Sequence, residues 1–336
     1  MIKYIYILAG ITSANFYYGG HMKHIFIVNP KAGKEKSLGL IPFIEEYFKD
    51  KDEEFCIRVT EYPGHATELA KEYSSQGKCR IYSIGGDGTV NEIVNGIAGS
   101  ESVLGVIPTG SGNDFIRSVH TPFEIKDMIL STINGEEKSI DLAKVNDKYF
   151  INISSIGFDA EVVFNADKFK KVRGITGSMA YVLSIIYTIF IKKVCNINID
   201  IDGKKIKLKA ILAAIANGRY YGGGIIPTPD AKLDDGLFDI CMVTDLSRIK
   251  MLGLFPKYMK GQHAQLKQVS FYKGKKISIE SDEDLCLNID GEIVTAKTVA
   301  FEIIENGIKV LFPVREGFSS IDSATDRVKE REAVKL

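Results

Sequence analysis

The sequence has 336 residues, with 43 basic and 43 acidic side chains, and therefore carries no formal net charge at pH 7. This length favours two domains, and a hydrophobic content of 45% excludes disorder over most of the chain. The absence of net charge argues against a protein that coats nucleic acid, so we expect no nucleic-acid partner.

Residues 1–21 differ in character from the rest. Within 1–20 the one charge is Lys3, and the apolar run over 5–11 is too short to span a bilayer. Gly20-His21-Met22 is typical of the remnant of a cut expression tag. We therefore expect residues 1–21 to be a tag or another non-native extension, and Met22 to be the natural start.

Strands and helices alternate from Lys23 onward. Apolar runs rich in β-branched residues predict strands over 24–28, 55–59, 80–84 and 103–107. Apolar residues at helical spacing predict helices over 38–48, 66–73 and 89–97. This order predicts a doubly wound α/β domain with a parallel sheet. Because ligands bind beyond the carboxyl ends of such strands, we expect the loops 29–33, 85–88 and 108–114 to converge on one face.

Strands dominate after about residue 140. They are predicted over 139–145, 149–154, 196–201, 205–216, 237–243, 276–281, 285–289 and 299–304. Asp202-Gly203 and Asn306-Gly307 are typical of turns between strands, and two helical insertions are expected over 160–172 and 177–192. The pattern predicts a mainly antiparallel β-sandwich. We expect the α/β domain to span 22–141, the sandwich domain to span 142–312, and a tail, 313–336, to pack back on the first domain.

Gly85-Gly86-Asp87-Gly88-Thr89 follows a predicted strand and opens a helix. Glycines let backbone N–H groups approach an anion, and the helix N-terminus adds partial positive charge, so the loop suits phosphate. A carboxylate there makes sense when a divalent cation bridges it to the phosphate. The P-loop and dinucleotide-binding fingerprints are both absent from the sequence. A second loop, Pro108-Thr-Gly-Ser-Gly-Asn-Asp114, also combines glycines with a carboxylate at the next strand end.

Five segments together resemble the diacylglycerol kinase catalytic family, particularly its soluble bacterial members, and more distantly sphingosine and ceramide kinases. They are Asn29-Pro-Lys-Ala-Gly33, Gly85-Gly-Asp-Gly-Thr-Val-Asn-Glu92, Pro108-Thr-Gly-Ser-Gly-Asn-Asp114, Leu233-Asp-Asp-Gly236 and Asp290-Gly-Glu292. The resemblance covers about residues 22–315. It is highly specific for the family and less specific for the acceptor lipid.

The resemblance implies that the glycine-rich loops bind ATP, with Asp87 and Asp114 organising magnesium and the triphosphate. The implied nucleotide contacts are Asn29, Pro30, Lys31, Ala32, Gly33, Thr60, Gly86, Asp87, Gly88, Thr89, Val90, Asn91, Glu92 and Thr109. It also makes Glu292 the candidate general base for the attacking hydroxyl. Without the family, Asp290-Gly291 would be interpreted as a hairpin turn and Glu292 as a surface charge.

The resemblance further implies two metal-related positions. Asp141 would belong to a magnesium–water network, although a solvated acid at a strand edge is an open alternative. Asp235, with the carbonyls of Lys232 and Leu237, would form a structural magnesium loop, because hard cations prefer oxygen ligands. A simple Asp-rich turn is the alternative there.

Residues 174–191 are eighteen consecutive uncharged residues, a marginal length for a membrane span. We interpret them as a helix that partly lines an acyl-chain pocket, with ordinary core packing as the alternative. Basic residues flank this run at Lys168, Lys170, Lys171, Arg173, Lys192 and Lys193. Such charges suit an anionic membrane surface, and they are equally compatible with a solvated helix face.

The sequence thus predicts an ATP- and Mg²⁺-dependent lipid kinase, with diacylglycerol as the leading acceptor and phosphatidic acid as the product. Five dispersed cysteines without a C-x-x-C pair favour a reducing compartment, so we expect a cytoplasmic protein associated peripherally with the inner face of the membrane. The family also suggests a homodimer. The alternatives are an NAD kinase-like enzyme, which shares the Gly-Gly-Asp-Gly-Thr loop, and a catalytically silent lipid-binding regulator.

Overall fold

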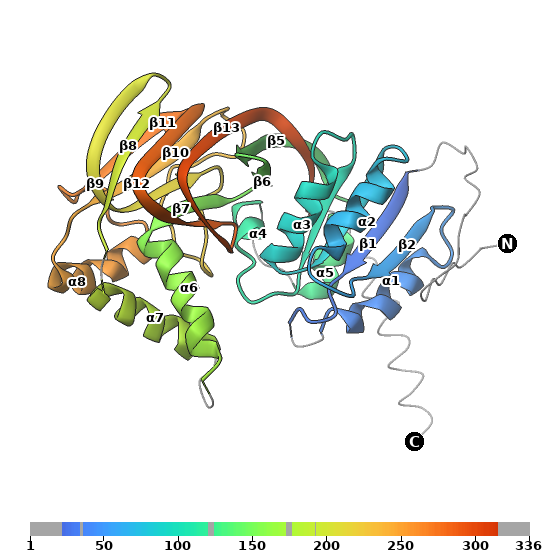
Figure 1. Cartoon of the computed structure of the whole chain (residues 1–336). Coiled ribbons are helices and arrows are strands. Elements are labelled where there is room, and N and C mark those ends of the chain that lie inside the picture. The colour runs from blue at the N-terminus through green and yellow to red at the C-terminus, as the bar shows by residue number, and fades with distance from the viewer. Residues whose placement is uncertain (1–21, 34–35, 120–123, 173–176, 192, 315–336) are drawn as a thin grey trace.

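The computed structural model describes residues 22–33, 36–119, 124–172, 177–191 and 193–314 (Figure 1). An α/β half and a β-rich half share one 13-stranded sheet. Its main path runs β11-β10-β9-β7-β12-β13-β4-β3-β1-β2, with β5, β6 and β8 paired beside it. The predicted tag over 1–21, and the tail beyond Val314, lie outside the described residues.

The first domain is built on four parallel strands in the order β4-β3-β1-β2. The strands are β1 (Lys23–Val28), β2 (Phe55–Val59), β3 (Cys79–Gly85) and β4 (Val103–Pro108). The helices are η1 (Leu38–Leu40), α1 (Ile41–Phe48), α2 (His65–Ser74), α3 (Asp87–Ile97), α4 (Asp114–Val119) and α5 (Ile125–Ile133). The predicted α/β architecture is confirmed, and α4 and α5 are additions to it.

Helices cover both faces of this sheet because successive side chains of a strand point to opposite sides. Ile25 and Ile27 of β1 belong to a core that includes buried residues of α2 and α3. Phe26 and Val28 belong to a separate core with residues of α1 and α5. A strand buried on both faces is continuously apolar, which is why β1 stands out in the sequence.

The second domain is mainly antiparallel, as predicted. Its strands are β5 (Glu136–Val145), β6 (Lys148–Phe150), β7 (Ile153–Gly157), β8 (Cys195–Ile201), β9 (Lys204–Ala216), β10 (Phe238–Thr244), β11 (Val269–Gly274), β12 (Lys276–Ile289) and β13 (Glu292–Phe312). Its helices are α6 (Phe158–Lys170), α7 (Gly177–Ile191) and α8 (Arg248–Met259), of which α8 was not predicted.

The strand β13 joins the two halves. It pairs antiparallel with β12 and β5. Near its C-terminal end it also pairs parallel with β4, at Lys309↔Val103 and Val310↔Leu104. The sequence predicted a strand over 299–304 alone, whereas β13 runs from Glu292 to Phe312. The candidate base therefore begins the same strand that enters the first domain's sheet.

The prediction of a turn between strands at Asn306-Gly307 is wrong. Both residues lie inside β13, where the register with β5 shifts between Ile304 and Ile308. Asn306 has φ +52°, and its N–H donates to Asp141 Oδ1 at 3.0 Å, so the turn-like dipeptide forms an irregularity within a continuous strand. By contrast, Asp202-Gly203 does form the turn between β8 and β9, with φ +51° and +89°.

Candidate active site

The loops that follow β1, β3 and β4 converge at one edge of the parallel sheet. Asn29 Nδ2 donates to Thr89 Oγ1 at 3.0 Å, and the N–H groups of Thr109 and Gly110 donate to Gly85 O at 2.9 and 3.2 Å. A β-carbon on Gly110 would lie 2.5 Å from Gly86 Cα. Because no side chain fits between these loops, their main chains form the surface that a ligand would meet.

Asp87 begins α3 and connects the loop after β3 to the loop after β4. Its Oδ1 accepts the N–H of Asp114 at 2.7 Å and that of Phe115 at 3.3 Å, which caps the start of α4. A β-carbon on Gly112 would lie 2.7 Å from Asp87 Oδ2, so glycine is required beside this carboxylate. The other oxygen of Asp87 is thus directed towards the Gly110–Gly112 loop.

Asp114 is buried, and its Oδ2 accepts the N–H of Gly223 at 2.8 Å. Burial, together with the neighbouring Asp87, raises the pKa of Asp114 to about 6, while the hydrogen bond from the Gly223 N–H opposes the shift. A carboxylate with a raised pKa beside a second carboxylate is typical of a site that takes up a cation.

Three buried oxygens in the 108–114 loop have no hydrogen-bond partner. They are Thr109 Oγ1, Asn113 Oδ1 and Asp114 Oδ1. Asp114 Oδ1 lies 3.8 Å from Arg117 Nε. Because buried polar atoms normally have hydrogen-bond partners, Thr109 Oγ1 and Asn113 Oδ1 are candidates to contact a ligand. In the part of the chain that the structure describes, no cluster of three His, Cys, Asp or Glu could hold a metal. Asp87 and Asp114 nevertheless fit Mg²⁺, which commonly uses one or two carboxylates together with substrate phosphates and water.

The turn that carries Glu292 is fastened to the first domain through Asp290. The Asp290 carboxylate accepts the N–H groups of Ile151 and Ile153 at 2.9 Å each and that of Asn152 at 3.3 Å. It also accepts Asn91 Nδ2 at 3.3 Å, from the helix that opens at the Gly85–Gly88 loop. Burial raises the pKa of Asp290 to about 6, although all these donors favour its charged form.

Glu292 is the first residue of β13 and is half exposed. Its Oε2 lies 2.7 Å from Lys148 Nζ, on β6. The residue after Lys148 is held from α3, because Tyr149 N donates to Asn95 Oδ1 and Asn95 Nδ2 donates to Tyr149 O, both at 2.9 Å. Both members of the pair therefore stand on backbone that is tied to α3.

Two predicted nucleotide contacts have other partners. Val90 is buried in the core of the first domain. Glu92 Oε2 accepts the N–H of Ala66 at 3.1 Å, so the carboxylate serves the first turn of α2. The structure thus assigns these side chains to packing and capping.

Other predicted contacts lie at the strand ends. Lys31 N donates to Asn29 Oδ1 at 3.0 Å, and Thr60 N donates to Val28 O at 2.9 Å. Gly33 has φ +62°, and a β-carbon there would overlap Thr109 O. These residues therefore belong to the edge where the loops converge.

The loop that was predicted to bind a structural magnesium ion is paired with a lysine of β11. Asp235 Oδ2 lies 2.9 Å from Lys273 Nζ, and Asp239 Oδ2 lies 3.0 Å from the same ammonium. Asp141 is buried against this loop, where its Oδ2 accepts the N–H of Gly236 at 2.7 Å. In this structure Lys273 thus neutralises the two carboxylates, and Asp141 accepts the backbone N–H groups of Gly236 and Asn306. A magnesium ligand role for Lys232, Asp235, Leu237 and Asp141 remains a prediction.

The sequence analysis missed the loop over 217–224, whose Gly223 N–H reaches Asp114. Gly222, Gly223 and Gly224 all have positive φ, and this run of glycines was the available signal. The loop is anchored by a buried polar cluster, in which Tyr221 OH donates to Asp159 Oδ2 and lies 3.0 Å from Tyr258 OH.

The helices α6, α7 and α8 lie together at one end of the second domain (Figure 1). Their inner sides join a core with β7, β9 and β10, but their outer sides expose many large apolar residues. These are Phe164, Val172, Met179, Val182, Leu183, Ile186, Tyr187, Phe190, Ile191, Ile249, Leu252 and Met259. The side chain of Ile249 is 83% exposed and that of Phe190 is 61% exposed. So many exposed large apolar residues on three helices differ from an ordinary protein surface, where such residues are scattered singly.

The same helices also carry exposed basic residues. Lys168, Lys170, Lys171, Arg248, Lys250, Lys257 and Lys260 belong to the same helices or follow them directly. Arg173 and Lys192 lie outside the described residues. None of the helices over the described residues is long and apolar enough to cross a membrane.

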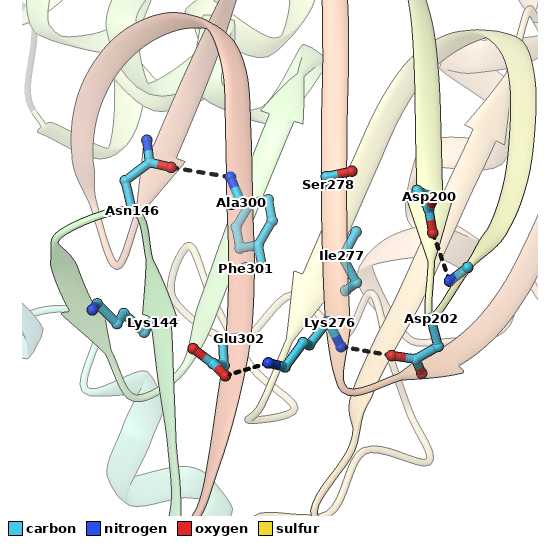
Figure 2. A pocket seen from close by; sticks show the side chains of 11 residues that line it. Lys144, Asn146, Asp200, Asp202, Lys276, Ile277, Ser278, Ala300, Phe301 and Glu302 are labelled. Atoms are coloured by element: carbon cyan, nitrogen blue, oxygen red, sulfur yellow. Dashed lines mark hydrogen bonds and ion pairs between the residues drawn. The ribbon is translucent and has the colours of Figure 1, made fainter.

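A hollow of about 460 Å³ lies on the sandwich, away from the convergent loops (Figure 2). Strands β5, β8, β12 and β13 line it, and none of the predicted site residues is among its lining residues. Figure 2 shows two of its charges already paired, with Lys276 Nζ 3.0 Å from Glu302 Oε1. A smaller hollow of about 290 Å³ lies at the end of α7, beside Thr188 and Ile191.

Comparisons with known proteins match both halves. Residues 23–145 match the diacylglycerol kinase catalytic domain, and residues 152–312 match the YegS C-terminal NAD kinase beta sandwich-like domain. A Staphylococcus aureus diacylglycerol kinase (strain bovine RF122 / ET3-1) is 32% identical over 309 residues, covering 90% of this chain and 98% of that protein. A Staphylococcus saprophyticus diacylglycerol kinase is 32% identical over 268 residues, covering 79% and 87%.

Solved structures agree with this comparison. A crystal structure of a diacylglycerol kinase from Bacillus anthracis strain Sterne matches with a TM-score of 0.67 at 25% identity, covering 88% of this chain and 98% of that chain. A second structure from the same strain matches with a TM-score of 0.70 at 28% identity and the same coverage. The fold is therefore shared over nearly the whole length of these structures.

Proposed function

Since the chain belongs to the diacylglycerol kinase family and is a lipid kinase, we propose that it transfers the γ-phosphoryl group of ATP to the free hydroxyl of diacylglycerol. The product is phosphatidic acid, and the reaction depends on Mg²⁺. The observation that carries the proposal is the meeting of two distant segments: Asn91 follows the Gly85–Gly88 loop, and it bonds to Asp290, two residues before Glu292.

Glu292 is assigned as the general base. It accepts the proton of the acceptor hydroxyl while the hydroxyl oxygen forms a bond to the γ-phosphorus, and the bond to the β-phosphate oxygen breaks with its electron pair leaving on ADP. Phosphoryl transfer depends mainly on positioning and charge neutralisation, so the base needs only to lie within hydrogen-bond reach of that hydroxyl.

The first domain binds the nucleotide in this proposal. Gly33, Gly86 and Gly110 let the main chains of the three loops approach closely, and helix α3 begins at the same edge, which suits a triphosphate. Asp87 and Asp114 would hold Mg²⁺ together with the phosphates, and the ion supplies charge neutralisation for the transferring group. The partnerless oxygens of Thr109 and Asn113 support a polar ligand at the same place.

The acceptor is proposed to enter from a membrane surface. The apolar helix surface, made of the outer sides of α6, α7 and α8, has the composition of an interfacial anchor, with large exposed apolar side chains and exposed basic residues on the same helices. An anionic leaflet complements these basic residues, because each one near it contributes about 1 kcal/mol. We place the protein at the inner face of the cytoplasmic membrane, where the lipid substrate and ATP are both present.

A transfer assay tests the proposal. Purified protein is incubated with labelled ATP, Mg²⁺ and, in separate reactions, diacylglycerol in mixed micelles or NAD. Label in phosphatidic acid is the expected result, and Glu292→Gln should abolish it while ATP binding persists. Label in NADP alone would establish the NAD kinase-like alternative, which the description of the C-terminal family keeps open. No transfer to either acceptor would favour a lipid-binding regulator.

A further inference from the structure

Lys148 is the cation nearest to the candidate base. Its Nζ lies 2.7 Å from Glu292 Oε2, and the two side chains are each half exposed. An exposed ion pair contributes little to stability, so folding alone gives no strong reason for this one. The backbone beneath it is nevertheless fixed, with Tyr149 bonded in both directions to Asn95 of α3.

The position of Lys148 relative to the reacting atoms follows from the proposed role of Glu292. A general base lies about 3 Å from the oxygen whose proton it takes. Lys148 Nζ therefore lies within about 6 Å of the acceptor oxygen when Glu292 Oε2 is the accepting atom. That oxygen is the one that becomes bonded to phosphorus.

During the transfer Glu292 loses its negative charge, and this gives the neighbouring ammonium of Lys148 a role in the reaction. Before transfer, the ammonium stabilises an ionised Glu292 and restricts the directions in which the carboxylate can point. When Glu292 takes the proton it becomes neutral, and the positive charge of Lys148 is left beside an oxygen that now carries a phosphoryl group. The same cation thus serves the base first and the new phosphate ester afterwards.

We propose that Lys148 is a positioning residue of the transfer centre, which holds Glu292 towards the acceptor hydroxyl and keeps positive charge beside the oxygen that is phosphorylated. This inference rests on the proposed function, in which Glu292 is the base. It adds a residue that no sequence motif marks, on a strand that lies 144 positions before the base.

Steady-state kinetics of three variants test the assignment. Lys148→Met should lower kcat about 10- to 100-fold and leave the KM for ATP unchanged, because the interaction acts on the transfer step. Lys148→Arg, which keeps the charge, should retain most of the activity. The control is Lys276→Met, which removes a more exposed ion pair to Glu302 further along β13 and should have no effect (Figure 2).

The outcomes are separable. A kcat of Lys148→Met within about twofold of the wild type, or a raised KM for ATP with an unchanged kcat, would refute the positioning role and leave the proposed function intact. An inactive wild-type protein would contradict the proposed function and, with it, this inference. Thermal melting of each variant confirms that the fold is preserved, as expected for a half-exposed side chain.

Discussion

Asn91 Nδ2 donates a hydrogen bond to Asp290 Oδ2 at 3.3 Å, although the two residues are 199 positions apart in the chain. Asn91 stands on the helix that begins at the glycine-rich loop, and Asp290 precedes Glu292 by two residues. This contact sets the distance between the phosphate-binding edge and the candidate base. The two halves of the proposed reaction are thereby coupled by a single buried carboxylate.

Replacing Asp290 by asparagine should weaken both the fold and the turnover. The amide presents a donor where the carboxylate accepted the N–H groups of Ile151, Asn152 and Ile153, and an unsatisfied buried group costs about 1–3 kcal/mol. We expect the free energy of unfolding to fall by about 2 kcal/mol and kcat to fall at least tenfold. Chemical denaturation and the transfer assay measure the two effects.

The exposed neighbour Asp147 provides the matched control, since Asp147→Asn should change stability by less than about 0.5 kcal/mol. Equal stability of Asp290→Asn and the wild type would show that the hydrogen bonds to Asp290 do not hold this turn.

Gly110→Ala should selectively impair nucleotide binding. The new methyl group would lie 2.5 Å from Gly86 Cα and 3.2 Å from its nitrogen, so the two loops must separate. We expect ATP affinity to drop at least tenfold, measured by titration calorimetry. Gly39→Ala is the control, because a β-carbon there meets nothing within 4 Å. Unaltered ATP affinity in Gly110→Ala would mean that the nucleotide does not use this edge.

The buried Asp159 should give the protein a pH-dependent stability. Burial raises its pKa to about 7, against the hydrogen bonds from Tyr221 and Tyr258 that favour the charged form. The native state therefore binds the proton more tightly than the unfolded state, where the pKa is about 3.9. Stability contributed by this group is complete at low pH and is lost as pH rises from about 4 to about 7.

Asp159→Asn should remove this part of the pH dependence, so that the free energy of unfolding changes less between pH 5 and pH 8 than in the wild type, by about 2–3 kcal/mol. Urea denaturation at several pH values measures the difference. Asp282→Asn, an exposed acid, should leave the profile as it is. If Asp159→Asn has the same dependence of unfolding free energy on pH as the wild type, Asp159 does not change its protonation state between pH 5 and pH 8.

Lys273 should determine whether the 233–239 loop responds to magnesium. In the wild type its ammonium is shared by Asp235 and Asp239, so Mg²⁺ without nucleotide should not raise the melting temperature. Lys273→Met leaves two neighbouring carboxylates unpaired, and we expect a loss of about 1–3 kcal/mol that Mg²⁺ partly restores. Lys275→Met, which removes a pair to exposed Glu305, is the control. Stabilisation of the wild type by Mg²⁺, lost in Asp235→Asn, would instead confirm the metal loop predicted from the sequence.

Substitutions on the apolar helix surface should weaken membrane binding and spare the chemistry. Phe190→Glu and Ile249→Glu each place a charge where an apolar side chain would enter the interface, and we expect about tenfold weaker binding to vesicles. Sedimentation with phosphatidylcholine vesicles, with and without phosphatidylglycerol, measures it. Leu38→Glu, on an exposed residue of the first domain, is the control.

Activity on a short-chain, water-soluble diacylglycerol should be unchanged in both variants, which separates a failure of docking from a failure of catalysis. If Phe190→Glu and Ile249→Glu both bind the two vesicle types as tightly as the wild type does, the membrane contact lies elsewhere on the protein.

The parts of this structure that the sequence predicted are those encoded locally. The Gly85–Gly88 loop was informative because a second loop with glycines and a carboxylate follows the next strand, and the fold and family were confirmed. The helical stripe of α3 likewise predicted its position, but the resemblance alone could not show that Val90 packs in the core and that Glu92 bonds to Ala66.

The parts that escaped prediction depend on distant partners. Asn306-Gly307 has the composition of a turn, and the pairing of β13 with β5 keeps it in a strand. The helix α8 contains Pro256 and has no clean apolar stripe, so its order comes from packing against the domain's core. The partner of Lys148 is set by the approach of β6 to the start of β13, which no local pattern records.

The strand β13 has a consequence for how the molecule comes apart. It pairs with β12 in one half and, at Lys309 and Val310, with β4 in the other, so one strand belongs to both halves of the sheet. Detaching one half requires breaking the pairing of this shared strand. The two halves should therefore melt in one cooperative transition, and a fragment that ends before β13 should lack the order of either half on its own.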